Sequence, residues 1–376
     1  MADFLKRSWA EIRLSAVAHN YRRVRERVHG DCRVMAIVKA DAYGHGDLPT
    51  AVTLEKAGAD WFGVSNLDEA IRLREGGITR PILILSYTPP EEAARLAQYG
   101  ITQALLDGEY AANLNAAATA AGVTVDCHVK LDTGMSRVGF FYHDEEDDRA
   151  ALDDIAAACS LPQLAVTGIF THFAMADEQD GEAFTRRQFA LFTKATAALE
   201  QRGITFSLKH CCNSAATLRF PDMHLDMVRP GIVLYGLLPS PLFEKTVDLQ
   251  AAMTLKTVIS QVKTIPSGTP VSYGCTHTAD ADAVVATVPL GYADGYPRTL
   301  SNTATMQVNG RRVPLIGRIC MDQCVLDVTG VEGVAAGQSV TVFGDTPSAD
   351  EVADLANTIG YELICGIGKR VPRIYL

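Results

Sequence analysis

A lysine stands at the end of an apolar run in the stretch VMAIVKADAYGHG, residues 34–46. The run 34–38 is short, continuous and flanked by polar residues, which is typical of a strand buried on both faces of a parallel sheet. Such burial would make a charged ammonium group at Lys39 costly and would lower its pKa. A neutral lysine amine is a good nucleophile toward carbonyl compounds, so Lys39 is a candidate for Schiff-base chemistry.

Polar residues also follow other short apolar runs farther along the chain, which resemble the run 34–38. If the runs are the strands of a (β/α)₈ barrel, their carboxyl ends share one rim, where catalytic groups sit. Each residue alone has an ordinary explanation, such as a solvated lysine or a hydrogen-bonded core histidine. Their coincidence on one rim favours a functional site. The residues are Lys39, Lys130, Asp132, Arg137, His172, His210, Ser214, Arg229 and Gly231.

Pyridoxal 5′-phosphate (PLP) is a carbonyl compound that would use several of these residues. Its phosphate needs hydroxyl and backbone N–H donors, which Tyr43, Ser214, Gly231 and Ile232 offer without a large basic patch. Its pyridine nitrogen needs a partner that sets its protonation, and Arg229 is the candidate.

Eight apolar, β-branched runs alternate with Ala-rich helical patterns in the first part of the chain. Helical segments such as 47–59 and 66–77 end at or near glycine, a usual stop signal. The alternation predicts a (β/α)₈ barrel. The expected strands cover residues 33–39, 60–66, 81–87, 101–107, 123–131, 165–170, 204–210 and 223–229.

The pattern changes after residues 239–241, which contain two prolines. From about residue 249 the strands follow one another without long helices, and turn signals such as 265–268 and 308–310 separate them. We expect a mostly antiparallel β domain here, with one late helix near 349–359.

The composition is that of an ordinary globular protein. The 376 residues are 48% hydrophobic and 21% charged, enough for one large core and a second domain. A formal net charge of −10 gives no general attraction to nucleic acid or anionic membranes. No apolar signal segment or bilayer-spanning run is found, so we expect a cytoplasmic protein. The nine cysteines lack metal-site spacing, so we expect reduced thiols and no metal.

Nine motifs along the whole chain resemble those of the PLP-dependent alanine racemases. The resemblance implies an N-terminal (β/α)₈ TIM-type barrel over 12–240 and a C-terminal β domain over 241–376, which an N-terminal strand within 1–11 joins. It also implies an isomerase that interconverts L- and D-alanine. The motifs are VKADAYGHG (38–46), KLDTGMSRVGF (130–140), THFAMADE (171–178), HCCNSAAT (210–217), MVRPGIVLYG (227–236), VSYGCTHTA (271–279), GYADGYPR (291–298), GRICMDQCVLDV (317–328) and YELICGIGKRVPR (361–373).

The resemblance implies two bases on opposite faces of the substrate. Lys39 would hold PLP and act as the base for D-alanine, while Tyr273 would be the base for L-alanine. His172 would sit behind Tyr273 in a relay that includes Arg229 and His210. Two bases suit a racemase, because one would tend to return the proton to the side from which it came. An arginine at the pyridine nitrogen would leave that nitrogen largely unprotonated and weaken the ring as an electron sink.

Other roles also come from the resemblance. Arg137 would contact the PLP phenolic oxygen and the substrate carboxylate. Lys130 would lie beside it, and in many relatives this lysine is carbamylated. We carry the carbamate over as a hypothesis, the alternative being an unmodified lysine.

The family shares its active site across a homodimer. Tyr273, Met321 and Asp322 would come from the partner subunit, whereas Tyr43 and Tyr361 would reach the phosphate from the subunit that holds Lys39. The remaining residue of this set, which would line the substrate entrance, is Tyr292. Half-buried aromatics and turn carboxylates are common, so structural roles stay open for Tyr292 and Asp322.

Three positions depart from the family motifs. Ser136 replaces a usual glycine, Cys212 a usual alanine, and Met175 a usual smaller residue. None of them removes a catalytic group. They put in doubt only the conformation of the Arg137 loop and the packing near the relay.

Three other classes of PLP protein share part of this pattern. PLP-dependent basic amino-acid decarboxylases share the architecture but pair the pyridine nitrogen with a carboxylate, where this chain has Arg229. Single-barrel PLP-binding proteins lack a C-terminal domain. Serine racemases of the vancomycin-resistance type share the motifs, but commonly have asparagine at the position of Tyr361, so serine or broad alanine/serine racemisation is the alternative activity. The D-alanine would serve peptidoglycan synthesis, although a catabolic role stays open.

Overall fold

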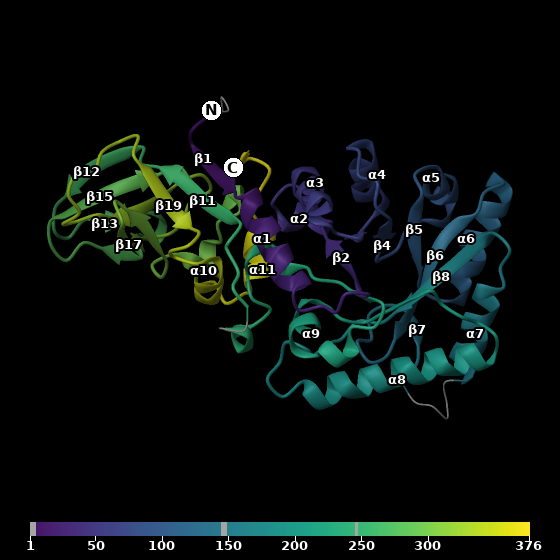
Figure 1. Cartoon of the computed structure of the whole chain (residues 1–376). Coiled ribbons are helices and arrows are strands. Elements are labelled where there is room, and N and C mark those ends of the chain that lie inside the picture. Colours follow the sequence, from purple (N-terminus) through teal and green to yellow (C-terminus); the bar gives the residue numbers. More distant parts are fainter. Residues whose placement is uncertain (1–4, 144–148, 245–246) are drawn as a thin grey trace.

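Two sheets organise the chain, and they form the separate halves that Figure 1 shows side by side. The computed structural model describes residues 5–143, 149–244 and 247–376. The first sheet is the barrel of parallel strands and the second is a mostly antiparallel sheet. This confirms the predicted fold class.

All eight predicted barrel strands are present, and all pair in parallel. The strand order is β10-β2-β3-β4-β5-β6-β8-β9. The seam between the two end strands carries backbone hydrogen bonds from Asp226 N to Lys209 O at 3.1 Å and from Arg229 N to Cys212 O at 2.9 Å. The strands are β2 Arg33–Ile37, β3 Trp61–Val64, β4 Ile82–Ile84, β5 Ile101–Leu105, β6 Val125–Asp132, β8 Leu164–Phe170, β9 Leu208–His210 and β10 Met227–Val228; a short strand, β7 Phe140–Phe141, pairs with β6 and was not predicted.

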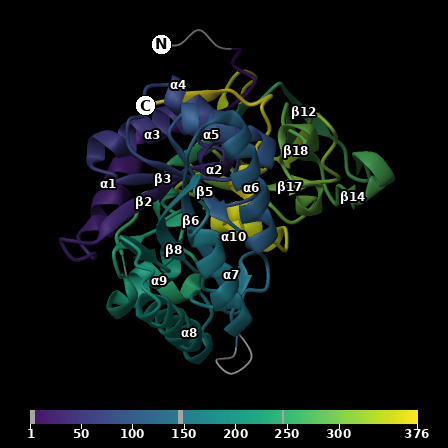
Figure 2. The same ribbon diagram turned by 90° about the vertical axis from the view of Figure 1, so that its right-hand side faces the viewer.

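Helices surround the barrel strands, as Figure 2 shows. Local sequence sets their ends: Asn66 and Asp107 cap α4 and α6 with side-chain oxygens, and Gly58 and Gly122 end α3 and α6 with positive φ. The helices are α1 Leu14–Arg25, α2 Lys39–Tyr43, α3 Asp47–Ala57, α4 Leu67–Glu75, α5 Ala93–Gln98, α6 Gly108–Ala121, α7 Arg149–Cys159, α8 Glu182–Gln201 and α9 Ser214–Arg219. No helix in the described ranges is long and apolar enough to cross a membrane.

The second sheet has nine strands in the order β12-β15-β18-β17-β16-β19-β11-β1-β20. The predicted turn at 308–310 joins β16 to β17, and Asn309 and Gly310 have φ of 50° and 75°, as a two-residue hairpin requires. The strands are β1 Ser8–Ile12, β11 Met253–Val258, β12 Gln261–Ile265, β15 Ala283–Val288, β16 Thr305–Val308, β17 Arg311–Ile316, β18 Cys324–Asp327, β19 Ser339–Phe343 and β20 Arg373–Tyr375; β13 Pro270–Val271 and β14 His277–Thr278 form a separate pair.

The N-terminal strand β1 belongs to this second sheet, where it pairs with β11 and β20. Residues 1–4 of the expected N-terminal strand lie outside the described residues.

Two helices, not one, stand near the C-terminus: α10 Ala349–Leu355 and α11 Gly360–Cys365. The predicted single helix 349–359 was therefore too long, and α11 was missed. Helix α11 packs against α2 of the barrel. At this contact a Cβ on Gly44 would lie only 2.4 Å from the carbonyl oxygen of Ile364. The second half of the chain thereby brings Tyr361 to the barrel rim.

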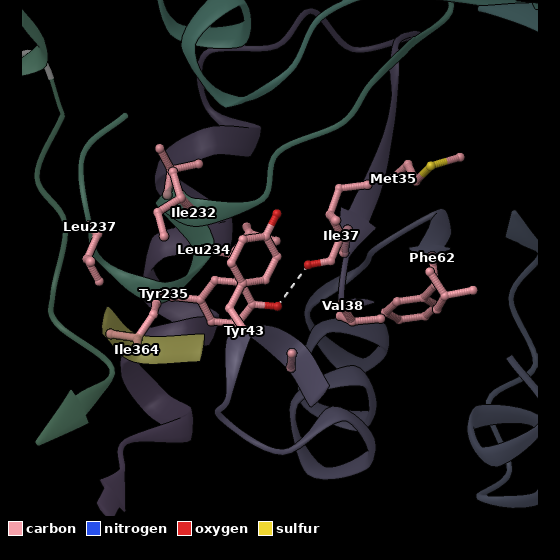
Figure 3. Packing of buried hydrophobic residues seen from close by; sticks show 14 of the residues in the cluster. Met35, Ile37, Val38, Tyr43, Phe62, Ile232, Leu234, Tyr235, Leu237 and Ile364 are labelled. Atoms are coloured by element: carbon pink, nitrogen blue, oxygen red, sulfur yellow. Dashed lines mark hydrogen bonds between the residues drawn. The ribbon is translucent and has the colours of Figure 1, made fainter. Parts of the chain in front are cut away.

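The buried core continues up to this rim. Figure 3 shows Tyr43 and Tyr235 packed beside Ile37, with the ring centroids of the two tyrosines 4.9 Å apart. The Tyr235 hydroxyl donates a 2.8 Å hydrogen bond to the carbonyl oxygen of Ile37. The end of β2 is therefore held in a dry, closely packed environment directly before Lys39.

Candidate active site

Lys39 begins a turn of left-handed helix. The four residues that follow it, 40–43, all have φ between 52° and 54°, and none of them is glycine. This conformation costs an L-residue roughly 1–2 kcal/mol each. Backbone hydrogen bonds from Ala42 N to Val38 O (2.9 Å) and from Gly44 N to Ala40 O (3.0 Å) close the turn. Strain of this kind persists only where the surroundings enforce it, and it is typical of functional sites.

Two buried side chains support the left-handed turn. The carboxylate of Glu69 accepts hydrogen bonds from Ala40 N and Ser65 N, each at 2.8 Å. The Nδ1–H of His45 donates to the carbonyl oxygens of Ala42 and Tyr43, each at 3.1 Å. Burial lowers the pKa of His45 to about 4, so this ring is neutral at pH 7.

The Lys39 amine lies in surroundings that disfavour its charge. Burial lowers its pKa, and the nearby Arg137 guanidinium lowers it further, while Glu69 and Cys365 act in the opposite direction. The free amine, which is the nucleophilic form, is thereby made more accessible near neutral pH.

Arg229 lies at the centre of a buried hydrogen-bond network and is 3% exposed. Its Nη1 lies 2.9 Å from His210 Nδ1. Its Nη2 donates to Thr171 O at 2.7 Å and to Cys211 O at 3.0 Å, and lies 3.3 Å from His172 Nδ1. Burial lowers the pKa of Arg229 to about 10, which still leaves it a cation at neutral pH.

The two histidines bound to Arg229 are neutral. Burial lowers the pKa of His172 and His210 well below the ordinary value, and the Arg229 charge adds to the effect. The structure thus brings together the three relay residues predicted from the sequence.

The residues expected at the phosphate also gather at one place. Ser214 Oγ accepts a 2.8 Å hydrogen bond from Gly231 N, and Ile232 begins the short helix η3 Ile232–Tyr235. A Cβ on Gly231 would lie 2.7 Å from the Tyr43 hydroxyl, so only glycine leaves this space open. The ring of Tyr361 lies 6.1 Å from that of Tyr43. Hydroxyls and a close backbone N–H are the donor set that a phosphate ester requires.

Lys130 is buried beside the rim, with its Nζ 4.9 Å from the ring centre of Phe170. Burial lowers its pKa well below the ordinary value, as do Arg229 and Arg137, while Asp132 acts in the opposite direction. The surroundings of Lys130 therefore favour the neutral form of its amine.

The loop after Lys130 is organised by Asp132. Its Oδ1 accepts hydrogen bonds from the backbone N–H groups of Gly134, Met135 and Ser136, each at 3.0 Å. Ser136 has a φ of 55°, in the region that favours glycine. The serine that replaces the usual glycine of the family motif therefore has a strained backbone, directly before the exposed Arg137.

The remaining predicted residues lie on the C-terminal half. Tyr273 is 71% exposed, Met321 53% and Tyr292 44%. Asp322 forms a 2.7 Å ion pair with Arg370. Strand β13 ends two residues before Tyr273, and Figure 1 shows it away from the barrel strand β2 that leads to Lys39.

Sequence reasoning missed Glu69 and His128. Glu69 supports the turn at Lys39, and His128 Nδ1 lies 3.1 Å from His210 Nε2. A signal for His128 existed, because residues 128 and 130 of one strand point to the same side. For Glu69 the sequence offers no such signal, since a glutamate in the first turn of a helix is usually an exposed residue that favours the helix dipole.

Comparison with known proteins gives matches along the whole chain. The family "Alanine racemase, N-terminal domain" matches residues 12–239, and "Alanine racemase, C-terminal domain" matches residues 252–375. An alanine racemase from Desulfovibrio desulfuricans is 46% identical over 382 residues, with 100% of each chain covered. Another, from Desulforamulus reducens, is 45% identical over 370 residues and 98% of each chain.

A solved structure agrees with these matches. The alanine racemase of Clostridium difficile 630 superposes with a TM-score of 0.93 at 36% identity, covering 100% of this chain and 97% of that one. Because the similarity extends over both halves, the chain belongs to the alanine racemase family and is an isomerase, an amino-acid racemase.

Proposed function

We propose that this protein interconverts L- and D-alanine in sites shared between two subunits, with Lys39 of one subunit and Tyr273 of the partner subunit as the two bases. The observation that carries the proposal is that these two residues lie in different halves of one chain and differ in exposure. Lys39 lies at the barrel rim beside the buried network, whereas Tyr273 is 71% exposed on the other half. A two-fold dimer would bring the exposed tyrosine of one chain to the rim of the other.

The residues at the rim fit PLP. Tyr43, Ser214, Gly231 and Ile232 would hold its phosphate, with Tyr361 beside them. When bound, PLP supplies a carbonyl carbon that condenses with amines and a conjugated ring that accepts electrons from the substrate. The desolvated amine of Lys39 is suited to hold that carbonyl carbon, because burial favours its neutral form.

The two bases would move the α-proton on opposite faces. Lys39 Nζ would take the proton of D-alanine, and Oη of the partner subunit's Tyr273 would take that of L-alanine. His172 Nδ1 faces the Arg229 guanidinium, a donor, so the proton of its neutral ring sits on Nε2. That N–H would be available to stabilise a tyrosinate oxygen.

Arg229 would face the pyridine nitrogen. Its guanidinium keeps its protons at neutral pH and is held by two carbonyl oxygens and two imidazoles. It can donate a hydrogen bond to the nitrogen without protonating it. A ring left neutral in this way would favour proton return over side reactions such as transamination.

Arg137 would bind the substrate carboxylate, and we propose that Lys130 carries a carbamate beside it. The neutral amine of Lys130 is the form that adds to CO₂, forming an N–C bond and releasing one proton. Burial with two arginines nearby favours this neutral form. The carbamate would replace a repelling cation with an anion that pairs with Arg137.

Specificity would come from the side chains around the entrance. Met321 and Asp322 of the partner subunit would line the substrate site, and Tyr292 the path to it. Tyr361 would crowd a side chain larger than methyl, although one extra hydroxyl is usually worth only about 1–3 kcal/mol of discrimination. We therefore propose alanine as the main substrate and serine as a slower one.

The division of the chain and its cellular role are also proposals. We assign the barrel to 12–240 and the β domain to 241–376, with the strand in 1–11 added to the latter; the pairing of β1 with β11 and β20 supports this assignment. We further propose that the enzyme works in the cytoplasm and supplies D-alanine for peptidoglycan.

Circular dichroism of L-alanine and L-serine solutions, incubated separately with the PLP-loaded protein, tests the activity. The alanine signal should decay to zero and the serine signal should decay much more slowly. Equal decay would make this a broad or serine-directed racemase, and no decay with either would contradict the proposed reaction.

A further inference from the structure

His128 lies at the inner end of the network that holds Arg229. It is fully buried, and its Nδ1 is 3.1 Å from Nε2 of His210, whose Nδ1 is in turn 2.9 Å from Arg229 Nη1. None of the roles proposed above uses His128. It is a buried, ionisable side chain connected to the site through one other imidazole.

The donors and acceptors in this chain of groups determine where the protons are. A guanidinium only donates, so Nδ1 of His210 must accept from Arg229. The single proton of the neutral His210 ring then sits on Nε2 and is donated to Nδ1 of His128. The proton of His128 must in turn sit on its own Nε2. Burial lowers the pKa of His128 to about 3, which is in keeping with a neutral ring.

Burying His128 at this position is energetically unfavourable. Its Nε2 is buried and has no hydrogen-bond partner among the described residues. The neighbouring strand offers Gly168, where a Cβ would lie 2.6 Å from that nitrogen, and the β6–β8 register shifts between Cys127 and His128. Trp61 packs on the ring at a centroid distance of 5.3 Å. An apolar residue at position 128 would avoid the unpaired Nε2–H. The benefit of a histidine here must therefore come from Nδ1, which contacts His210.

We propose that His128 is a positioning residue that holds His210 in its Nε2–H form, so that Nδ1 of His210 always faces Arg229 as an acceptor. Among the described residues, His210 is the side chain that accepts from Nη1 of Arg229. Loss of this acceptor would free the guanidinium to tilt. The proton assignment stands without the proposed function, whereas its value for catalysis rests on Arg229 meeting the cofactor.

Nitrogen-15 NMR of the intact, PLP-loaded enzyme with labelled histidine tests the assignment directly. His210 should show an unprotonated Nδ1 and a protonated Nε2, with no change between about pH 6 and 9. A His210→Gln sample identifies the signals. A proton on Nδ1 of His210, or a mixture of both forms, would overturn the proposal in the unmodified enzyme.

Variants at and beside His128 test the consequence. In His128→Asn the side-chain oxygen can replace Nδ1 as the acceptor, so we expect a single His210 form and a kcat within about twofold of the parent. In His128→Leu the buried Nε2–H of His210 loses its acceptor, and this penalty opposes the preference that Arg229 sets. We therefore expect mixed His210 forms and a kcat lower by about tenfold, with a smaller change in KM. Gly168→Ala retains the histidine at position 128 but displaces its ring from its position beside His210, so it should give the same result as His128→Leu. It serves as the test if His128→Leu does not fold.

The outcomes separate the two proposals. Unchanged His210 signals and an unchanged kcat in a folded His128→Leu or Gly168→Ala variant would overturn the positioning role. If the His210 assignment holds but Arg229→Gln keeps full activity, the proposed role of Arg229 fails and the proton assignment remains.

Discussion

Lys39 lies between a dry strand end and a left-handed turn, and its proposed reactivity rests on that position. Burial at the end of β2 and the nearby Arg137 both disfavour the ammonium form. The strained turn fixes where the side chain leaves the backbone. The residue is therefore suited to hold a carbonyl group and, once released, to act as a base.

Borohydride reduction of the PLP-loaded enzyme should attach PLP permanently to Lys39. Peptide mass mapping should find the added mass on the peptide that contains Lys39, and Lys39→Ala should show none. Lys256→Ala, a change on the other sheet at a lysine paired with Glu11, is the matched control and should label normally. Labelling of a different lysine in the unmodified enzyme would contradict the assignment.

Tyr273→Phe should separate the two faces of the substrate. The variant retains Lys39, so in D₂O it should exchange the α-proton of D-alanine but not that of L-alanine, and racemisation should fall by roughly 10²–10⁴-fold. Proton NMR of each enantiomer measures the exchange. Tyr87→Phe, at another exposed tyrosine, is the control. Equal loss of exchange from both enantiomers would count against separate bases.

At the level of elements, the barrel strands were largely predictable from the sequence, whereas the backbone conformation at the rim after Lys39 was not. Every barrel strand was found because buried parallel strands are short apolar runs, a pattern visible without any structure. The left-handed turn could not be foreseen, since residues 40–43 are Ala-Asp-Ala-Tyr and contain no glycine. Hydrogen bonds with Glu69, which is distant in the sequence, and with the buried His45 stabilise that conformation.

The C-terminal end and the site show the same limit. Helix α11 was missed because its six residues are too few for a helical period to emerge. Residue type and placement at strand ends marked Lys39, His210 and Arg229 as candidates, but the pairing of His210 with His128 depends on how two strands meet across the barrel. The spacing of His128 and Lys130 indicates a shared side of the strand, but it does not predict the contact between His128 and His210.

The strained Ser136 offers a test of the loop that carries Arg137. Ser136→Gly should raise the free energy of unfolding by about 0.5 kcal/mol, because relief of a positive φ outweighs the added freedom of the unfolded chain. Met135→Gly, at a neighbour whose φ is negative, should lower it by about 1 kcal/mol. Urea denaturation measures both. A loss of equal size in the two variants would show that the turn at Ser136 is not strained.

The turn after Lys39 should make stability depend on pH. The folded-state pKa of His45 is lowered to about 4, so below the ordinary value of about 6.5 the unfolded chain binds a proton that the folded chain does not. Its contribution is complete above about pH 6.5 and is lost as the pH falls toward 4, by about 3 kcal/mol. His172 and His210 act in the same direction.

Urea denaturation of the PLP-loaded enzyme at a series of pH values measures this dependence. The free energy of unfolding should fall steadily between about pH 6.5 and 4, and His45→Asn should reduce the slope. A flat profile in the parent, or an unchanged slope in the variant, would disagree with a neutral, buried His45.

At the scale of the whole molecule, the C-terminal half exposes the side chains that the proposed dimer would use. Tyr273, Tyr292 and Met321 are large apolar side chains that are 44–71% exposed on the C-terminal half. The proposed homodimer would cover them and supply the second base, so a monomer would be inactive.

Mixed dimers test the shared site most directly. Lys39→Ala and Tyr273→Phe chains, each with its own affinity tag, are co-expressed and the heterodimer is isolated through both tags. One of its two sites then has both native bases and the other has neither. We expect about half the specific racemase activity of the unmodified dimer, while both homodimers stay inactive. An inactive heterodimer, with its composition confirmed by mass, would show that Lys39 and Tyr273 act within one chain or not as a pair.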